Sequence, residues 1–250
     1  MSAHAEQNRV FSDLAVDLVA QSEKSGIPLR VLGSVAVYLK CPRRRSFLDS
    51  DRAPFSDIDF ATTSESSEEV ARLLVERGCE ENENWRMLRG HQRRVFYSRE
   101  NITFEVFVDN LCLSQSIPLR GRLSLDYPTI CLTDLLLSRV QKVRFEQKDL
   151  IDICVLLLEH ELGTRGGFDL GYILWLAAGH WRWWRVWKSA LSQLASGCQT
   201  VISTPEDRQA ITTTLSRLGH ELDSVPKTTA WRLRGLVGDR WAWHENVESA

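Results

Sequence analysis

The pair Asp57 and Asp59, separated only by Ile58, constrains this chain more than any other feature of its 250 residues. Along an extended strand both carboxylates leave on the same face, while Ile58 points to the other face. Two carboxylates side by side repel each other unless a cation lies between them, and Mg²⁺ is a usual cation for such a pair. By itself the tripeptide is more often a solvated strand end or a turn, so the metal interpretation depends on the segments around it.

A glycine–serine turn, Gly33 and Ser34, lies upstream of this pair. It follows the short run Arg30-Val31-Leu32, for which we expect a strand, and leads into residues 35–39, for which we expect a short helix. Before this strand, apolar residues at helical spacing predict a helix over residues 8–25. A glycine lets the backbone approach a phosphate closely, and the first N–H groups of the helix would point toward that anion. The order strand, turn, helix, loop and Asp-x-Asp strand predicts a phosphate site beside a metal site.

A third acid, Glu105, lies within residues 102–109, which we expect to form a strand because apolar and polar residues alternate there. Glu105 and Asp109 share one face of this strand. An acid among so many apolar neighbours is costly unless it is paired or bound to a metal. Glu105, in the middle of the strand, and Asp109, at its end, therefore each need a partner or a metal if they are buried. An edge acid that faces water is the alternative for both.

Arginines gather in two parts of the first half of the chain. Residues 43–45 are three arginines in a predicted loop over residues 40–56. Four more, at positions 86, 89, 93 and 94, fall on predicted antiparallel strands at 85–89 and 91–98. Both groups are most simply solvated surfaces. Contact of the first group with a triphosphate or an acceptor, and a polyanion-binding edge at the second, are the sharper alternatives.

The spacing of Gly-Ser and Asp-x-Asp resembles the nucleotidyltransferase superfamily, which has the polymerase-beta-like fold. Further stretches resemble an uncharacterised bacterial branch of it: FEVFVD at 104–109, PTICLTDLLLSRVQ at 128–141, KDLIDICVLLLEH at 148–160 and WRLRGLVGDRWAW at 231–243. The resemblance covers about residues 27–245. It implies an α+β fold, with a mixed sheet flanked by helices in a catalytic domain at residues 1–130 and a helical domain at residues 131–250.

The resemblance also implies an activity, the transfer of a nucleoside monophosphate from a triphosphate such as ATP to an acceptor hydroxyl, with release of pyrophosphate. The acceptor would be RNA, transfer RNA included, or a small molecule. Glu105 would be the third carboxylate, because the matching strand of the superfamily carries one at its middle, and Asp109 at the strand end is the reserve candidate. Asp57, Asp59 and Glu105 would hold Mg²⁺, with Mn²⁺ as a substitute, and Glu105 would alternatively act as general base. Gly33 and Ser34 would bind the β- and γ-phosphates. The basic position of a later helix, here Arg139, would neutralise charge on the leaving pyrophosphate.

Two departures from the pattern of that superfamily leave a second interpretation open. Glu105 stands where the usual residue is Asp, and the turn at Gly33 contains only one glycine. Glutamate is one methylene longer, which changes the geometry available to a metal. The alternative function is therefore a catalytically inactive member that binds a nucleotide or a partner without chemistry.

From Leu132 onward the apolar spacing predicts helices. Asp149 and Asp152 open one of them, where the helix dipole favours acids. Residues 163–167 are glycine-rich and read as a hinge or linker. Eight of the nine tryptophans follow residue 170, and the run at 180–188 has four of them. Their helical spacing favours core packing over the stacking of nucleic-acid bases, and an interaction protein that uses a tryptophan surface is a further alternative.

Composition excludes several other classes. Hydrophobic residues make up 43% of the chain, which is enough for a packed core. The net charge of -2, from 31 basic and 33 acidic residues, does not indicate a globally basic nucleic-acid binder. No apolar run is long enough for a membrane span, and the first residues lack the pattern of a signal peptide. The six cysteines are scattered, which predicts reduced thiols and a cytoplasmic protein.

Overall fold

The structure is a computed structural model that describes residues 3–242. It combines a five-stranded mixed sheet and a two-stranded sheet with a majority of helical residues, so the predicted α+β class is confirmed. The chain divides into two compact units. The first takes the described residues up to Cys112 together with Ser116–Leu135, and the second takes Leu113–Gln115 and the described residues from Leu136 onward. The division falls inside helix α6 (Leu132–Val140), and separate roles for residues 1–130 and 131–250 stay a prediction.

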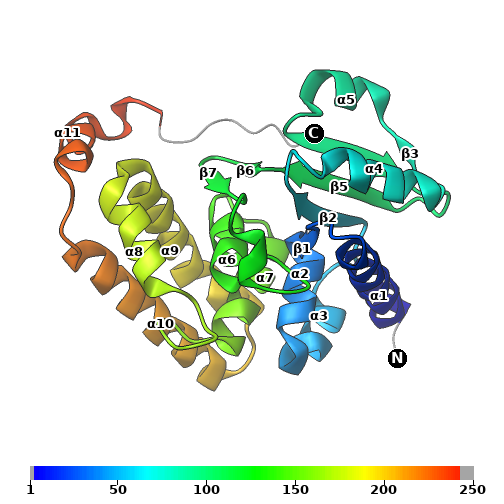
Figure 1. The fold of residues 1–250 in the computed structure, drawn as a ribbon. Helices are drawn as coiled ribbons and strands as arrows, with labels where there is room; N and C mark the ends of the chain where they lie inside the picture. The colour runs from blue at the N-terminus through cyan, green and yellow to red at the C-terminus, as the bar shows by residue number, and fades with distance from the viewer. Residues whose placement is uncertain (1–2, 243–250) are drawn as a thin grey trace. The chain divides into compact units, whose positions relative to one another are not determined.

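The sheet of the first unit places the Asp-x-Asp strand in its interior, between an edge strand and the central strand (Figure 1). Its order is β1-β2-β5-β4-β3. Strand β2 (Asp57–Thr62) pairs antiparallel with β1 (Arg30–Leu32) and parallel with β5 (Thr103–Val108). Strand β4 (Arg93–Tyr97) pairs antiparallel with β5 and with the short β3 (Glu80–Glu81). The two strands expected to bear carboxylates are therefore direct neighbours.

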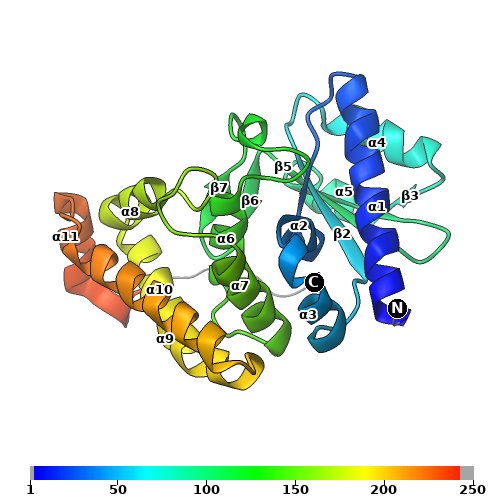
Figure 2. The same cartoon turned by 90° about the horizontal axis from the view of Figure 1, so that it is seen from below.

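One face of this sheet forms the core of the first unit. Alternation along the strands places buried Ile58, Phe60, Phe104 and Val106 on this face, and the rings of Phe60 and Phe104 stack 6.3 Å apart. Helices α1 (Ala3–Lys24) and α4 (Ser67–Glu76) lie close to each other in the same unit (Figure 2). An ion pair of 2.7 Å joins Arg77, just after α4, to Asp17 of α1. The predicted helix over 8–25 is confirmed and begins earlier.

Helix α2 (Gly33–Lys40) follows β1 directly, as expected. The predicted loop at 40–56 is wrong in part, because it contains a 3₁₀ turn, Pro42–Arg44, and helix α3 (Arg45–Asp51). The predicted strand at 85–89 is also wrong. These residues belong to helix α5 (Glu83–Arg89), because the side chain of Asn82 accepts the N–H of Trp85 and caps the first turn.

The remaining elements of the first unit are short. Strands β6 (Asn110–Cys112) and β7 (Ser116–Pro118) form an antiparallel pair, and a 3₁₀ turn covers Leu123–Leu125. Helix α6 then begins at Leu132. Within its first turn Asp134 is buried and pairs with Arg122 at 2.7 Å, so this acid has a structural partner inside the unit.

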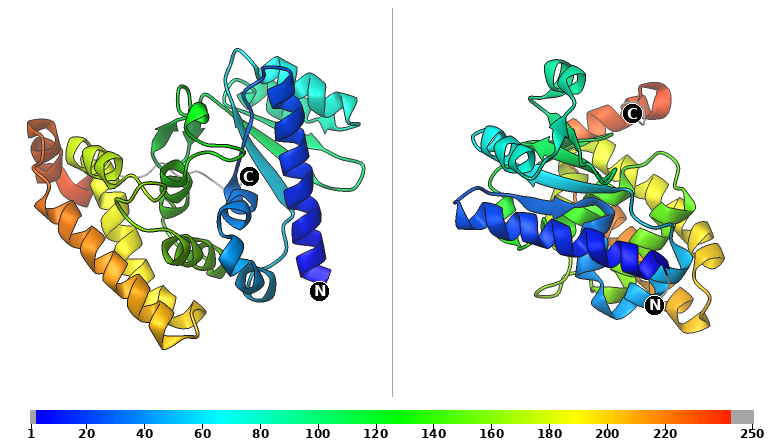
Figure 3. Two further views of the ribbon diagram at one scale, coloured as in Figure 1. Left: turned by 60° about the horizontal axis from the view of Figure 1, so that its bottom comes forward. Right: turned by 90° about the vertical axis from the view of Figure 1, so that its right-hand side faces the viewer.

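The second unit is helical. It contains α7 (Gln147–Glu159), α8 (Leu170–Gly179), α9 (Trp181–Val201), α10 (Pro205–Ser224), α11 (Thr229–Val237) and a 3₁₀ turn at Gly238–Arg240. Helices α9 and α10 run side by side and α9 also packs on α7 and α8 (Figure 3). Trp183 and Trp187 are buried in α9, which confirms the prediction that these two tryptophans pack in the core.

Two further predictions concern the connections of this unit. The glycine-rich residues 163–167 form a tight turn that is closed by a bridge between Leu162 and Phe168, so they do not link the two units. Helix α11 packs against α8 and α9, with the ring of Trp231 5.4 Å from that of Trp184. Trp243, the end of the last stretch in the resemblance, lies outside the described residues. Among the described residues, no helix is long and apolar enough to cross a membrane.

Candidate metal centre

Three carboxylates meet where β2 and β5 run in parallel. The register places Asp59 directly opposite Glu105 and Asp57 opposite Thr103, so all three acids share the sheet face that is opposite the core. Each offers a ligand oxygen, and these oxygens lie within 4.8 Å of one another. In the described part of the chain, these three acids form the group of acidic, histidine or cysteine side chains that lie close enough together to hold a metal ion. The structure thus brings together the three acids that the sequence singled out.

The chemistry of this donor set fits Mg²⁺. Mg²⁺ prefers hard oxygen ligands, and one or two carboxylates with phosphate oxygens and water usually complete its shell. Asp57 is exposed, whereas Asp59 and Glu105 are half-buried, so the group is open to a ligand on one side and held by protein on the other. Exposed acidic groups also occur without an ion. The surroundings of each carboxylate therefore distinguish a metal site from a solvated acidic surface.

Gly33 holds the first turn of α2 against Asp59. Its φ is +74°, a left-handed backbone that side chains rarely adopt. A Cβ at this position would lie 2.0 Å from Oδ2 of Asp59, which leaves no room for any side chain. The glycine is therefore needed for the close approach of the backbone to the Asp59 carboxylate, and its approach to a phosphate stays a prediction. The N-terminal end of a helix favours such a negative charge.

Ser34, the second residue of the turn, is contacted by Arg52, which the sequence did not single out. Nη2 of Arg52 donates a hydrogen bond to Oγ of Ser34, and Nη1 donates to the carbonyl of Ala53 at 2.8 Å. The side chain is buried and its guanidinium lies 5.0 Å from the ring centre of Phe55. An arginine is thus fixed beside the predicted phosphate turn. The only sequence signal for it is a basic residue shortly before the Asp-x-Asp strand.

Glu105 is paired with Arg93, the second arginine that matters here. Nη2 of Arg93 donates to Oε1 of Glu105. Burial raises the pKa of the Glu105 carboxyl, against the opposing effect of Arg93 and with a smaller contribution from Asp57 that adds to the rise. The prediction that Arg93 lies on a solvated strand face is wrong. Alternation along β4 could have shown that Arg93 and Val95 face the side of Glu105, but only once the pairing of β4 with β5 was known.

The other arginines of that predicted surface take different positions. Arg86 and Arg89 lie on helix α5 instead of a strand. Arg94 points to the opposite face of β4, where its buried guanidinium contacts Glu81 at 2.7 Å and Glu68 at 2.9 Å. None of these three is the partner of Glu105.

Asp109, the reserve candidate, is not part of the carboxylate group. It follows β5 with φ of +57°, a conformation that aspartate tolerates better than most residues. Its Oδ1 accepts the N–H of Ser64 at 3.0 Å. Its carboxylate therefore has a structural role at the end of the strand, and Glu105 is the third carboxylate of the group.

Two further phosphate contacts, of Arg139 and of the arginines at 43–45, stay predictions. Arg139 belongs to the second unit, where its Nη1 lies 3.8 Å from Oδ2 of Asp152. Asp152 is buried, so the helix dipole alone does not explain it, whereas Asp149 completes a capping box with Glu146. The arginines at 43–45 follow the C-terminal end of α2, about 12 Å from the turn at its other end for a helix of this length.

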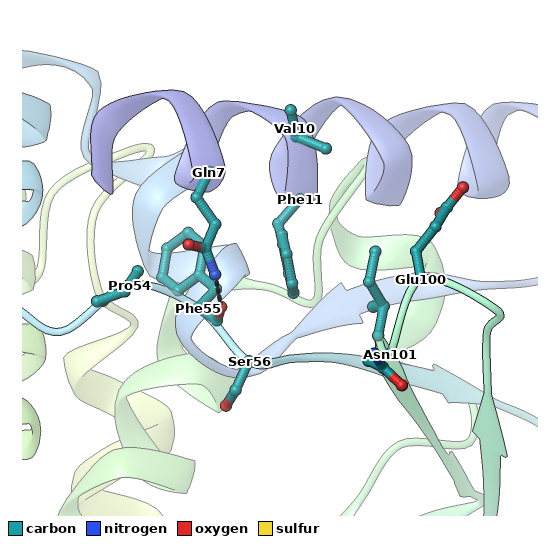
Figure 4. A pocket seen from close by; sticks show the side chains of 9 residues that line it. Gln7, Val10, Phe11, Pro54, Phe55, Ser56, Glu100 and Asn101 are labelled. Atoms are coloured by element: carbon teal, nitrogen blue, oxygen red, sulfur yellow. Dashed lines mark hydrogen bonds between the residues drawn. The ribbon is translucent and has the colours of Figure 1, made fainter. Parts of the chain in front are cut away.

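A separate pocket of about 590 Å³ lies in the first unit beside α1. Gln7 and Phe11 of α1 point toward the segment 54–56 that precedes β2, and Glu100 and Asn101 lie at the other end (Figure 4). None of the three carboxylates lines it. It is therefore distinct from the candidate metal centre.

Comparisons with known proteins were made for the whole chain. No protein-family model matches it, and no curated protein matches it. Among solved structures, the chain is similar to the crystal structure of an antigenic nucleotidyltransferase-like protein from Paracoccidioides brasiliensis. The two are 14% identical, the match covers 90% of this chain and 95% of that chain, and the TM-score is 0.38. A likeness at this level says nothing about activity, so function is argued from the residues of the site.

Proposed function

We propose that this chain is a Mg²⁺-dependent nucleotidyltransferase, which moves a nucleoside monophosphate from a nucleoside triphosphate to an acceptor hydroxyl and releases pyrophosphate. The observation that carries the proposal is the register of β2 on β5. It gathers the carboxylates of Asp57, Asp59 and Glu105 within 4.8 Å, next to a glycine turn that opens a helix. The resemblance of these same residues to nucleotidyltransferase motifs supports the reaction class.

Asp57, Asp59 and Glu105 would hold the metal ion. Bound there, Mg²⁺ or Mn²⁺ would neutralise triphosphate charge and make the acceptor hydroxyl more acidic. Gly33 and Ser34 would bind the β- and γ-phosphates through the first N–H groups of α2. Arg139 would neutralise charge on the leaving pyrophosphate, and Glu105 would alternatively accept the acceptor proton. The acceptor would be an RNA, transfer RNA included, or the hydroxyl of a small molecule.

The test is pyrophosphate release from each of the four common triphosphates with Mg²⁺, with and without total RNA. The chain with Asp57→Asn and Asp59→Asn is expected to lose release completely. A matched control, Glu76→Gln, changes an exposed acid on α4 outside the carboxylate group and should release pyrophosphate like the unchanged protein. Full release by the double variant would show that the carboxylate group is not the site of the reaction.

The pairing of Glu105 with Arg93 favours one second candidate, a member that binds nucleotides without turnover. In that case the third carboxylate serves the fold and does not reach the metal. Calorimetry would then show metal-dependent binding of a triphosphate while no pyrophosphate appears under any acceptor condition. Absence of both binding and release would exclude the two candidates together.

A further inference from the structure

We infer that Arg93 is a positioning residue, which holds the carboxylate of Glu105 in the orientation that a divalent cation requires. This inference rests on the proposed function, because it takes Asp57, Asp59 and Glu105 as the ligands of the cation. It adds a residue outside that ligand set and gives it a defined task.

The guanidinium of Arg93 is fixed from three sides. It donates to Oε1 of Glu105 through Nη2. Its central carbon lies 5.2 Å from the ring centre of Trp85 on α5 and 5.3 Å from that of Phe107, which lies two residues after Glu105 on β5. Its side chain is 23% exposed and that of Glu105 is 18% exposed. A flexible side chain on the surface would not keep such a geometry, whereas this one is packed on α5 and β5 together.

A carboxylate has two oxygens, so a hydrogen bond from Arg93 to Oε1 does not exclude a cation from Glu105. It restricts rotation of the longer glutamate side chain, which would otherwise lose rotamer freedom on binding the cation. Groups that orient the ligands of a metal are known to matter for affinity, and their removal typically costs about 10–100-fold. Glu105 has one methylene more than aspartate, so it has more freedom for Arg93 to remove.

The positive charge of Arg93 weakens cation binding, whereas its hydrogen bond to Glu105 strengthens cation binding. A positive group beside the site repels a divalent cation, so removing the charge alone would strengthen binding. Substitution by lysine separates the two effects, because lysine keeps the charge but lacks the planar guanidinium fork that bonds Glu105 and contacts the two rings. Arg93→Lys is therefore expected to bind the cation more weakly than the unchanged protein does.

The experiment titrates Mn²⁺ into the full chain and follows the free ion by electron paramagnetic resonance, with urea unfolding in EDTA as the second measurement. Arg93→Lys is expected to lose at least about tenfold in Mn²⁺ affinity, with little change in the urea midpoint. The matched control is Arg94→Lys on the next position of β4, where the buried arginine contacts Glu81 and Glu68. It should show the reverse pattern, with a lower urea midpoint and unchanged Mn²⁺ affinity.

A second arm asks whether Arg93 acts through Glu105. In a chain that carries Glu105→Gln, the further change Arg93→Lys should alter Mn²⁺ affinity by less than twofold. An equal loss in both backgrounds, or an Arg93→Lys chain that binds like the unchanged protein, would overturn the inference while the metal site stands. If the unchanged protein takes up no Mn²⁺, or if Asp57→Asn with Asp59→Asn leaves uptake intact, the proposed metal site fails and the inference fails with it.

Discussion

Gly33 and Gly26 share a left-handed backbone but differ in what surrounds them. Their φ values are +74° and +71°, yet a Cβ on Gly26 would have nothing within 4 Å, whereas one on Gly33 would overlap the Asp59 carboxylate. Gly26→Ala should therefore cost only the backbone strain, about 1–2 kcal/mol. Gly33→Ala should cost more in urea unfolding and should also displace Asp59, so that Mn²⁺ binding is lost. Equal costs and normal Mn²⁺ binding in both variants would contradict the close approach.

Asp57 belongs to a group of like charges that are close enough to repel one another. Asp57→Asn removes part of that repulsion from the protein without metal. We expect its free energy of unfolding, measured by urea titration in EDTA, to stay equal or to rise slightly, by about 0.5 kcal/mol at this exposed position. Its affinity for Mn²⁺ should be lost. A clear loss of stability in EDTA would instead identify Asp57 as a residue needed by the fold.

Among the individual residues of the candidate site, the sequence predicted the acids better than their partners. Asp57, Asp59 and Glu105 could be found because alternation along a strand depends only on local spacing. Arg52 and Arg93 could not, because their roles depend on which strands pair and on how an exposed-looking arginine is packed. Arg93 meets Glu105 only through the register of β4 on β5, which no local pattern encodes.

Among the elements, helix α9 has a glycine where it meets α7. A Cβ on Gly197 would lie 2.6 Å from a methyl carbon of Leu150, whereas one on Gly219 of α10 would make an ordinary contact of 3.6 Å with Leu191. Gly219→Ala should stabilise the protein by up to about 1 kcal/mol, since alanine favours helix. Gly197→Ala should lose that gain and destabilise by about 1–3 kcal/mol through overpacking. Thermal unfolding of the two variants gives the comparison, and equal stabilisation would show that α7 and α9 are not in close contact at this point.

The elements that were predicted incorrectly are short. Residues 85–89 were expected to form a strand, yet the N-cap at Asn82 and the helix-forming Glu, Met, Leu and Arg side chains give a helix. Helix α3 was missed for a related reason, because arginines suggested a solvated loop. The longer helices α1 and α9 were predicted well, since several turns of apolar spacing outweigh any single residue.

For the whole molecule, the cysteines give a test of burial. Four of the six are buried, Cys131 is intermediate and Cys112 is exposed. Burial raises the pKa of Cys131 to about 11 and that of Cys154 to about 12. At pH 8 a thiol reagent should therefore label Cys112 quickly and the other five slowly, and Cys112→Ser should remove the fast phase. Several fast thiols in the folded protein would contradict this packing.

The same thiols make stability depend on alkaline pH. The pKa of Cys131 is raised from 9.0 to about 11 in the folded protein, so the folded state keeps a proton that the unfolded chain releases. Its contribution to stability is fully present below pH 9 and is lost as pH rises toward 11. Urea midpoints measured across this window should fall with pH, and Cys131→Ala should make the fall less steep.

The helical character of the second half follows from periodicity, whereas the α+β class was implied by the resemblance. The resemblance also implied a division of the chain at 130/131, and the two compact units meet between Leu135 and Leu136, inside the continuous helix α6, where no glycine, proline or change of composition marks the exact place. The glycine-rich turn at 163–167 gave the stronger sequence signal but closes on itself within the second unit. Where a chain separates into compact parts depends on contacts between distant residues more than on local composition.

Arg93, which pairs with Glu105, also contributes to the net charge of the candidate metal centre. Three carboxylates and one guanidinium give the group two more negative charges than positive ones. One divalent ion brings this group to neutrality, a monovalent ion leaves it negative, and a trivalent ion makes it positive. A second divalent ion would add charge that only an incoming polyanion could balance. If the proposed metal site is correct, we expect Mn²⁺ titration to give one bound ion per chain without a triphosphate and a second only when a triphosphate is present.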